Sequence, residues 1–250
     1  EPMTSLNPVL KIKVQMNEIL IRHHKLTKKE ATKESIELLD AVGIPNPKQR
    51  INEYPHQFSG GMRQRVMIAM ALQCNPSLLI ADEPTTALDV TVQTEILKLL
   101  KSLQEKNKMS VLFITHDLTI VRQISDRVCV MNNGEIKESG ITKEIFANPQ
   151  HEYTKHLLSS EPEEKNLSYD SNGKDILSGK NLNVTFTIKW KGAGKSKILK
   201  IEAVKNISLN IKEGETLGIV GESGSGKTTL GQTLLRLVDK DSGNFVSGDI

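Results

Sequence analysis

Apolar residues in the first half of the chain follow two spacings, one typical of helices and one typical of buried strands. The helical spacing covers residues 8–43 and returns at 62–72 and 91–106. Continuous apolar runs at 78–81 and 111–114 are typical of strands buried on both faces of a sheet. Because these strands alternate with helices, the pattern predicts an α/β fold with a parallel sheet.

After residue 114 the chain contains a predicted hairpin and then a polar segment. Residues 127–131 predict a third strand, which the Asn-Asn-Gly sequence at 132–134 turns back into residues 135–137. Residues 159–175 are polar and lack any apolar periodicity, which is typical of a linker.

After the linker, apolar and polar residues alternate along 182–188 and 207–211. This alternation predicts antiparallel strands with one buried face. A buried strand is predicted at 216–220, running directly into a glycine-rich loop, and a helix is predicted at 229–237. The last third of the chain is therefore expected to hold an antiparallel β subdomain beside a phosphate-binding element.

The glycine-rich loop at 221–228 matches the pattern G-x-x-x-x-G-K-[ST] in full. Glycines let backbone N–H groups close around phosphate oxygens, and Lys227 adds a positive charge for the β- and γ-phosphates. The Thr228 hydroxyl is a ligand suited to Mg²⁺, and the following helix directs its N-terminal dipole at the same anion. The predicted ATP-binding residues here are Gly221, Glu222, Ser223, Gly224, Ser225, Gly226, Lys227, Thr228 and Thr229.

Two further motifs lie earlier in the chain. Ser59, Gly60 and Gly61 precede a predicted helix, so their backbone N–H groups form a second candidate anion site. Alone, such a triplet is an ordinary helix N-cap. However, it lies shortly before a buried strand that ends in Asp82 and Glu83, and this acidic pair favours a role in nucleotide chemistry.

Carboxylates at a strand end suit the handling of metal and water. We expect Asp82 to hold Mg²⁺, directly or through water, and Glu83 to orient and deprotonate the attacking water. His116 follows the strand at 111–114 and is placed to contact a γ-phosphate. The alternatives are a solvated acidic loop and a structural histidine.

Composition narrows the function classes. The chain has 33 Lys and Arg residues against 30 Asp and Glu, a formal net charge of +3, so nothing predicts a nucleic-acid partner. Cys74 and Cys129 lie in apolar runs and are expected to be buried free thiols, consistent with a reducing compartment. No apolar stretch of about 18 residues occurs, so any membrane association would come through a partner.

In combination, these motifs resemble those of ATP-binding-cassette (ABC) ATPases. Residues 58–61 are similar to the family signature Leu-Ser-Gly-Gly, with Phe58 as a conservative departure. The resemblance implies that Asp82 and Glu83 form the acidic strand motif, that His116 is the switch histidine, and that Asp89 ends the D-loop at 87–89. It also implies that Phe186 stacks on adenine, the alternative being a core strand residue.

A narrower resemblance points to bacterial importers of peptides. Residues 1–8, 82–93 and 145–158 are similar to segments of oligopeptide and dipeptide importers, including the fused two-cassette ATPases of peptide and microcin C uptake. That resemblance implies integral membrane permease subunits as partners, an indirect link to a periplasmic solute-binding protein, and a peripheral position on the cytoplasmic face of the inner membrane. It also implies that helices within 8–43 dock the permease.

The order of motifs differs from that of a single cassette, because the phosphate loop comes last. We interpret residues 1–160 as the C-terminal part of one cassette, 161–175 as a linker, and 176–250 as the N-terminal part of a second. The other halves of both cassettes are then expected partners, and this stretch alone should bind nucleotide weakly and turn over little. The alternative for the domain order is a circularly permuted single cassette. The alternatives for the function are a non-transport ABC ATPase, a glutathione importer and a degenerate regulatory module.

Overall fold

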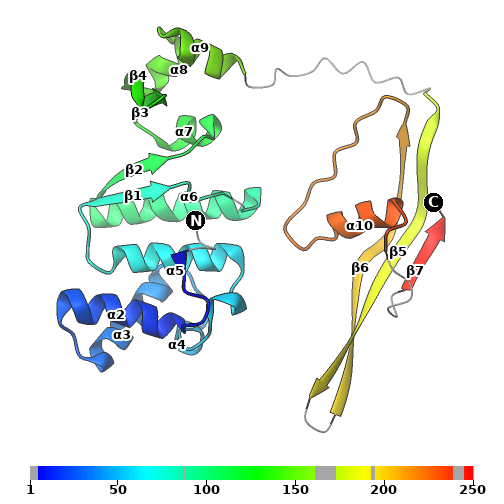
Figure 1. Ribbon diagram of the computed structural model, residues 1–250, viewed down its shortest axis with the longest axis horizontal. Helices are drawn as coiled ribbons and strands as arrows, with labels where there is room; N and C mark the ends of the chain where they lie inside the picture. The colour runs from blue at the N-terminus through cyan, green and yellow to red at the C-terminus, as the bar shows by residue number, and fades with distance from the viewer. Residues whose placement is uncertain (1–4, 87, 161–172, 193–194, 239–244, 250) are drawn as a thin grey trace. The chain divides into compact units, whose positions relative to one another are not determined.

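A computed structural model describes residues 5–86, 88–160, 173–192, 195–238 and 245–249 (Figure 1). The chain divides into two compact units, Glu1–Glu163 and Glu164–Ile250. The predicted linker lies mostly outside the described residues, as do residues 1–4 of the importer-like segment and Ala87 of the predicted D-loop.

Helices form the first part of unit 1, as the spacing over 8–43 and 62–72 predicted. Lys25, with a φ of +56°, ends the first of them, and Thr27 begins the next with a capping box. In that box, the Glu30 side chain accepts the backbone N–H of Thr27 at 2.9 Å. The helices are α2 (Ile12–His24), α3 (Lys28–Ala41), α4 (Pro47–Arg50), the 3₁₀ helix η1 (Pro55–Gln57) and α5 (Gly60–Leu72).

A buried polar network joins α2 to α3, which pack side by side (Figure 1). The Asn17 amide donates to the Thr32 hydroxyl at 2.8 Å and accepts from the Ser35 hydroxyl at 3.1 Å. Ser35 is fully buried and Asn17 nearly so. Because each buried polar group has its partner, the network fixes how the two helices pack together without a desolvation penalty.

A two-stranded parallel sheet forms the centre of unit 1. β1 (Leu78–Asp82) pairs with β2 (Ser110–Ile114), and α6 (Val90–Asn107) connects them. Parallel strands need such a crossover connection. Leu79 on β1 packs in one hydrophobic core with residues of α3, α5 and α6. These elements confirm the predicted strands at 78–81 and 111–114 and the helix at 91–106.

The predicted burial of these strands on both faces is wrong. Leu78, Ile80, Leu112 and Ile114 are each at least 45% exposed, while Leu79 is 8% exposed. The helices cover one face of the sheet, and nothing among the described residues of unit 1 covers the other. An α/β sheet of this kind normally carries layers on both faces.

The remainder of unit 1 is a β-hairpin with short helices. β3 (Arg127–Asn132) pairs with β4 (Glu135–Ile141) in antiparallel fashion, as the Asn-Asn-Gly turn predicted. Asn133 and Gly134 both have positive φ, which suits a tight hairpin turn. The helices are α7 (Leu118–Ile124), α8 (Thr142–Ala147) and α9 (Glu152–Ser159).

Unit 2 is built on an antiparallel sheet with the strand order β6-β5-β7. β5 (Asp175–Gly192) and β6 (Lys195–Lys212) contain the two alternating segments and confirm them as antiparallel strands. α10 (Lys227–Leu234) covers the sheet, and β7 is Phe245–Asp249. The core joins Leu182, Val184, Val204, Leu230 and Leu234.

Two local expectations are wrong. Residues 216–220 form no strand, and Val220 is 93% exposed. A parallel strand needs a neighbouring strand to satisfy its backbone, and the described strands of unit 2 pair only with one another. Cys74 and Cys129 are exposed rather than buried, because Cys74 lies just beyond the end of α5 and Cys129 on an uncovered face of the β3–β4 hairpin.

We predict that Asn17→Ala lowers the free energy of unfolding by about 1–3 kcal/mol, because Ser35 would keep a buried hydroxyl without its acceptor. Urea unfolding of the chain, followed by circular dichroism, measures this change. Asn52→Ala is the matched control, since the Asn52 amide is exposed and makes one long bond of 3.4 Å. Equal effects of the two substitutions would contradict a role for the network.

Candidate functional site

The start of α5 presents the predicted second anion site. Ser59 is the N-cap, and its hydroxyl accepts the backbone N–H of Met62 at 3.3 Å. Gly60 and Gly61 form the first helical turn, where backbone N–H groups have no partner within the helix. Phe58, just before the cap, is buried in the core of unit 1. The structure therefore places this triplet at a helix N-terminus, as the sequence predicted.

The strand ends of β1 and β2 lie next to each other. Parallel register pairs Asp82 with Ile114, and the backbone N–H of Glu83 donates to the Ile114 carbonyl at 2.9 Å. This pairing brings Glu83 and His116, 33 residues apart, into direct contact, with 2.9 Å between Glu83 Oε1 and His116 Nδ1. The sequence analysis predicted both residues but not their contact.

Glu83 is held in a strained and well-defined position. Its φ is +44°, a left-handed conformation that costs energy for a residue with a side chain. The Thr86 hydroxyl donates to its Oε2 at 2.7 Å. Thr86 is a functional candidate that sequence reasoning missed, although a hydroxyl three residues after a strand-end carboxylate was a visible signal.

Hydrogen bonding shifts the titration of both groups. The bond to His116, followed by the bond to Thr86, lowers the pKa of the Glu83 carboxyl. The Glu83 carboxylate, through its hydrogen bond and its charge, raises the pKa of the His116 imidazole. Both side chains are substantially exposed, so water screens the interaction.

Asp89 lies at the start of α6, where its carboxylate Oδ1 accepts the backbone N–H of Val92 at 3.0 Å. In the structure Asp89 is therefore a helix N-cap, and its contribution to nucleotide binding stays a prediction. Among the described residues, no cluster of three or more His, Cys, Asp or Glu side chains is arranged to hold a metal.

The glycine-rich loop in unit 2 closes onto the start of α10. Gly224 and Gly226 have φ values of +81° and +94°. A Cβ on Gly226 would lie 2.2 Å from the Ala203 carbonyl oxygen, so no side chain fits there. Lys227 Nζ donates to the carbonyls of Gly221 and Glu222, both at 2.7 Å. These bonds hold the ammonium group within the loop.

Phe186 lies on β5, opposite Ile201 on β6, and packs against the core of unit 2. This contact accounts for an aromatic residue at that position. Stacking on adenine stays a prediction. The loop lies in unit 2, whereas Ser59, Asp82, Glu83 and His116 lie in unit 1.

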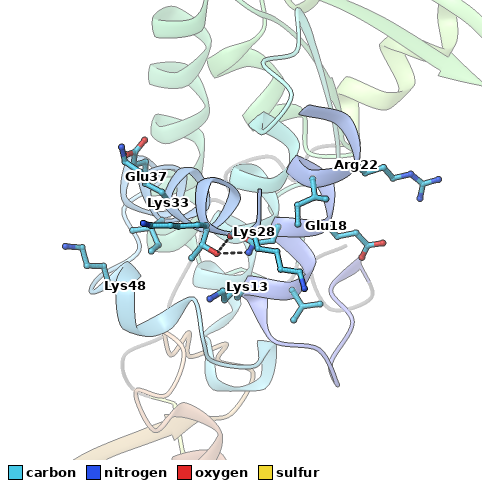
Figure 2. A pocket seen from close by; sticks show the side chains of 13 residues that line it. Lys13, Glu18, Arg22, Lys28, Lys33, Glu37 and Lys48 are labelled. Carbon is cyan, nitrogen blue, oxygen red and sulfur yellow. Dashed lines mark hydrogen bonds and ion pairs between the residues drawn. The ribbon is translucent and has the colours of Figure 1, made fainter. Parts of the chain in front are cut away.

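A separate groove runs between α2 and α3 and has a volume of about 1350 Å³ (Figure 2). Apolar side chains of Val14, Ile21 and Ile36 line it. Its charged lining residues are mostly basic: Lys13, Arg22, Lys28, Lys29, Lys33 and Lys48 against Glu18 and Glu37.

Comparison with known proteins agrees with this geometry. A phosphate-binding loop at a helix start and a strand-end carboxylate with a histidine partner define a nucleotide-binding protein of the P-loop class. The family model described as "ABC transporter" matches residues 3–86 and 204–249, more than half of the chain. The chain therefore belongs to the ABC transporter family.

Individual relatives within the ABC transporter family are ATP-binding proteins of transport systems. The chain is 52% identical over 238 residues to a peptidoglycan transport ATP-binding protein, YejF, of Agrobacterium fabrum, covering 95% of the chain and 43% of the relative. It is 44% identical over 272 residues to the glutathione import ATP-binding protein GsiA of Escherichia coli, covering 98% and 44%. The chain thus spans less than half the length of these relatives.

A solved structure supports the fold. The cbiO1 protein of Clostridium perfringens, part of the ABC transporter complex cbiONQ, superposes with a TM-score of 0.52 and 32% identity, covering 59% of this chain and 57% of that one. None of the helices among the described residues has both the length and the apolar character needed to span a bilayer.

We predict that His116 titrates above the ordinary histidine value and that Glu83→Gln returns its pKa toward about 6.5. Because the pKa of His116 is raised in the folded state, the ion pair stabilises the fold fully below the unfolded-state pKa. This stabilisation is lost as the pH rises through the folded-state pKa. Nuclear magnetic resonance titration of the imidazole protons measures this. In Thr86→Ala, the control, the His116 pKa should stay raised; an unchanged His116 pKa in Glu83→Gln would contradict the pairing.

Proposed function

We propose that this chain is part of an ATP-hydrolysing subunit of a bacterial importer for peptides or peptide-like solutes. The observation that carries the proposal is the closed phosphate loop at the start of α10, with Lys227 held inside it. Names of the relatives, peptidoglycan transport and glutathione import, support the importer class. They also make glutathione a second candidate solute.

The two units are best explained as parts of two different cassettes. In this proposal residues 1–160 complete the first cassette, 161–175 link the two, and 176–250 begin the second. The division into two compact units and the relatives of more than twice the length support it. Lys227 then faces an ATP that Ser59, Gly60 and Gly61 contact from across the cassette interface, while Glu83 and His116 serve a second ATP.

Each residue has a role that its chemistry supports. Backbone N–H groups of the loop and Lys227 bind phosphate oxygens, and the start of α5 offers further N–H donors. Glu83 is a carboxylate whose pKa is held below its ordinary value by hydrogen bonds, and it accepts the proton of the attacking water. In the resting site His116 is held by its hydrogen bond to Glu83. Once the Glu83 side chain rotates toward the attacking water, His116 is free to contact the γ-phosphate.

Mg²⁺ fits the oxygen donors available in each unit. The Thr228 hydroxyl would hold it at the second cassette, and the Asp82 carboxylate would hold it at the first. Such a donor set suits Mg²⁺, which commonly takes one or two protein oxygens together with phosphates and water. When bound, the ion neutralises charge on the phosphates.

The α2–α3 groove supports a docking role for the helical part of unit 1. Its volume exceeds the roughly 300–1,000 Å³ of small-molecule sites, so a macromolecular segment fits better. Apolar and basic lining residues together complement an amphipathic helix that carries acidic residues beside its apolar stripe. We assign this helix to a permease subunit, which would hold the protein peripherally at the cytoplasmic face of the membrane.

We predict that the chain binds Mg-ATP weakly but measurably, and that Lys227→Ala weakens binding about tenfold or more through loss of a charged hydrogen-bond donor. Isothermal titration calorimetry measures both affinities. Lys205→Ala is the control, because Lys205 is an exposed lysine of unit 2 that forms a surface ion pair with Glu202. Equal binding by all three proteins would contradict the phosphate-loop assignment.

A second prediction concerns the groove. Reversing charge at its rim, Lys29→Glu with Lys33→Glu, should weaken association of the two-cassette protein with its permease and leave ATP affinity unchanged. Co-purification from detergent at increasing salt measures the association. Lys106→Glu with Lys108→Glu is the matched control, because these lysines lie at the C-terminal end of α6. Permease retention that is equal in both pairs of variants would contradict docking at this groove.

A further inference from the structure

The first turns of α5 and α6 lie against each other at Gly61 and Val92. A Cβ built on Gly61 would be 2.5 Å from the Cγ1 methyl of Val92, far closer than carbon atoms approach. The neighbouring Gly60 is different, because a Cβ there would meet Leu88 Cδ2 at an ordinary 3.6 Å. Gly61 is therefore the point at which the Val92 side chain touches the backbone of α5.

Val92 cannot easily move away from this contact. It is β-branched, and such side chains strongly prefer one χ1 rotamer in a helix. Its backbone is fixed as well, because its N–H donates to the Asp89 carboxylate at 3.0 Å. A methyl group added at Gly61 would thus push α5 itself rather than rotate a flexible side chain.

A second contact joins the same helices one turn further on. Arg65 on α5 forms an ion pair with Glu95 on α6 at 2.9 Å. The same guanidinium donates to the Val42 carbonyl at 2.7 Å. With contacts in two successive turns, the start of α5 cannot slide or tilt independently of α6.

We propose that Val92 is a positioning residue for the anion site at the start of α5. By its contact with Gly61, it fixes the distance between the N–H groups of Gly60 and Gly61 and the α6 N-cap, Asp89. A movement of the start of α6 is thereby transmitted to the anion site. This inference rests on the proposed function. It attributes the need for a glycine at position 61 to packing against Val92 rather than to the close approach of a phosphate.

The test exchanges volume across the contact in the two-cassette protein. Gly61→Ala should lower kcat about tenfold or more. This is the rate change that follows if the free-energy cost of overpacking the contact raises the activation barrier. Combining it with Val92→Ala removes the clashing methyl and should return kcat to within about threefold of wild type. KM for ATP should change less than kcat throughout, because Lys227 and its loop are untouched.

Gly60→Ala, alone and with Val92→Ala, is the matched control, since its Cβ faces Leu88 and should not be rescued. Loss of activity by Gly61→Ala in both backgrounds would overturn the proposal, because the glycine would then be needed for the ligand. Full activity in both backgrounds would also overturn it. If Val92→Ala restores only the unfolding midpoint and not kcat, the contact is purely structural and the proposal fails. An inactive wild-type protein would instead refute the proposed function.

Discussion

The parallel pairing of β1 with β2 is the constraint on which the unit 1 site depends. A one-residue slip in that register would turn every side chain of the slipped strand to the opposite face. It would also separate the carbonyl of Ile114 from the N–H of Glu83, a bond of 2.9 Å that sets the unusual backbone of Glu83. The strand ends therefore carry Asp82, Glu83 and His116 together only because the hydrophobic core fixes the strands from one side.

Helix N-termini supply the other half of the chemistry. α5 begins at Gly60, and α10 begins at Lys227 directly after its N-cap Gly226; both leave backbone N–H groups available to an anion. In unit 2 the loop is held by Lys227, whereas in unit 1 the turn is held by the Ser59 cap and by packing against α6. The same electrostatic device is thus positioned by different local contacts, which suits two sites that approach one ATP from opposite sides in the proposed assembly.

The sequence predicted much of this arrangement because its strongest signals are local. The phosphate loop, the helix start at Gly60 and the Asn-Asn-Gly hairpin all follow from short-range backbone requirements. The Glu83–His116 contact did not follow, since it depends on strand pairing between residues far apart in the chain. The strand predicted at 216–220 failed for a related reason: its apolar residues lack a neighbouring strand among the described residues of unit 2.

The exposed side chains on β1 and β2 have a similar cause: they are Leu78, Ile80, Leu112 and Ile114. A strand can be predicted from its apolar residues, but the layer that covers its second face comes from elsewhere. In the proposed two-cassette arrangement, another segment of the first cassette would cover that face. Another segment of the second cassette would pair with residues 216–220.

The central claim is that Glu83 handles the water that attacks ATP. Steady-state ATP hydrolysis by the two-cassette protein, compared between wild type and Glu83→Gln, tests it most directly. The account predicts a loss of at least about 100-fold in kcat with Mg-ATP binding retained, since removal of a general base commonly costs this much. Hydrolysis by Glu83→Gln at the wild-type rate would contradict it.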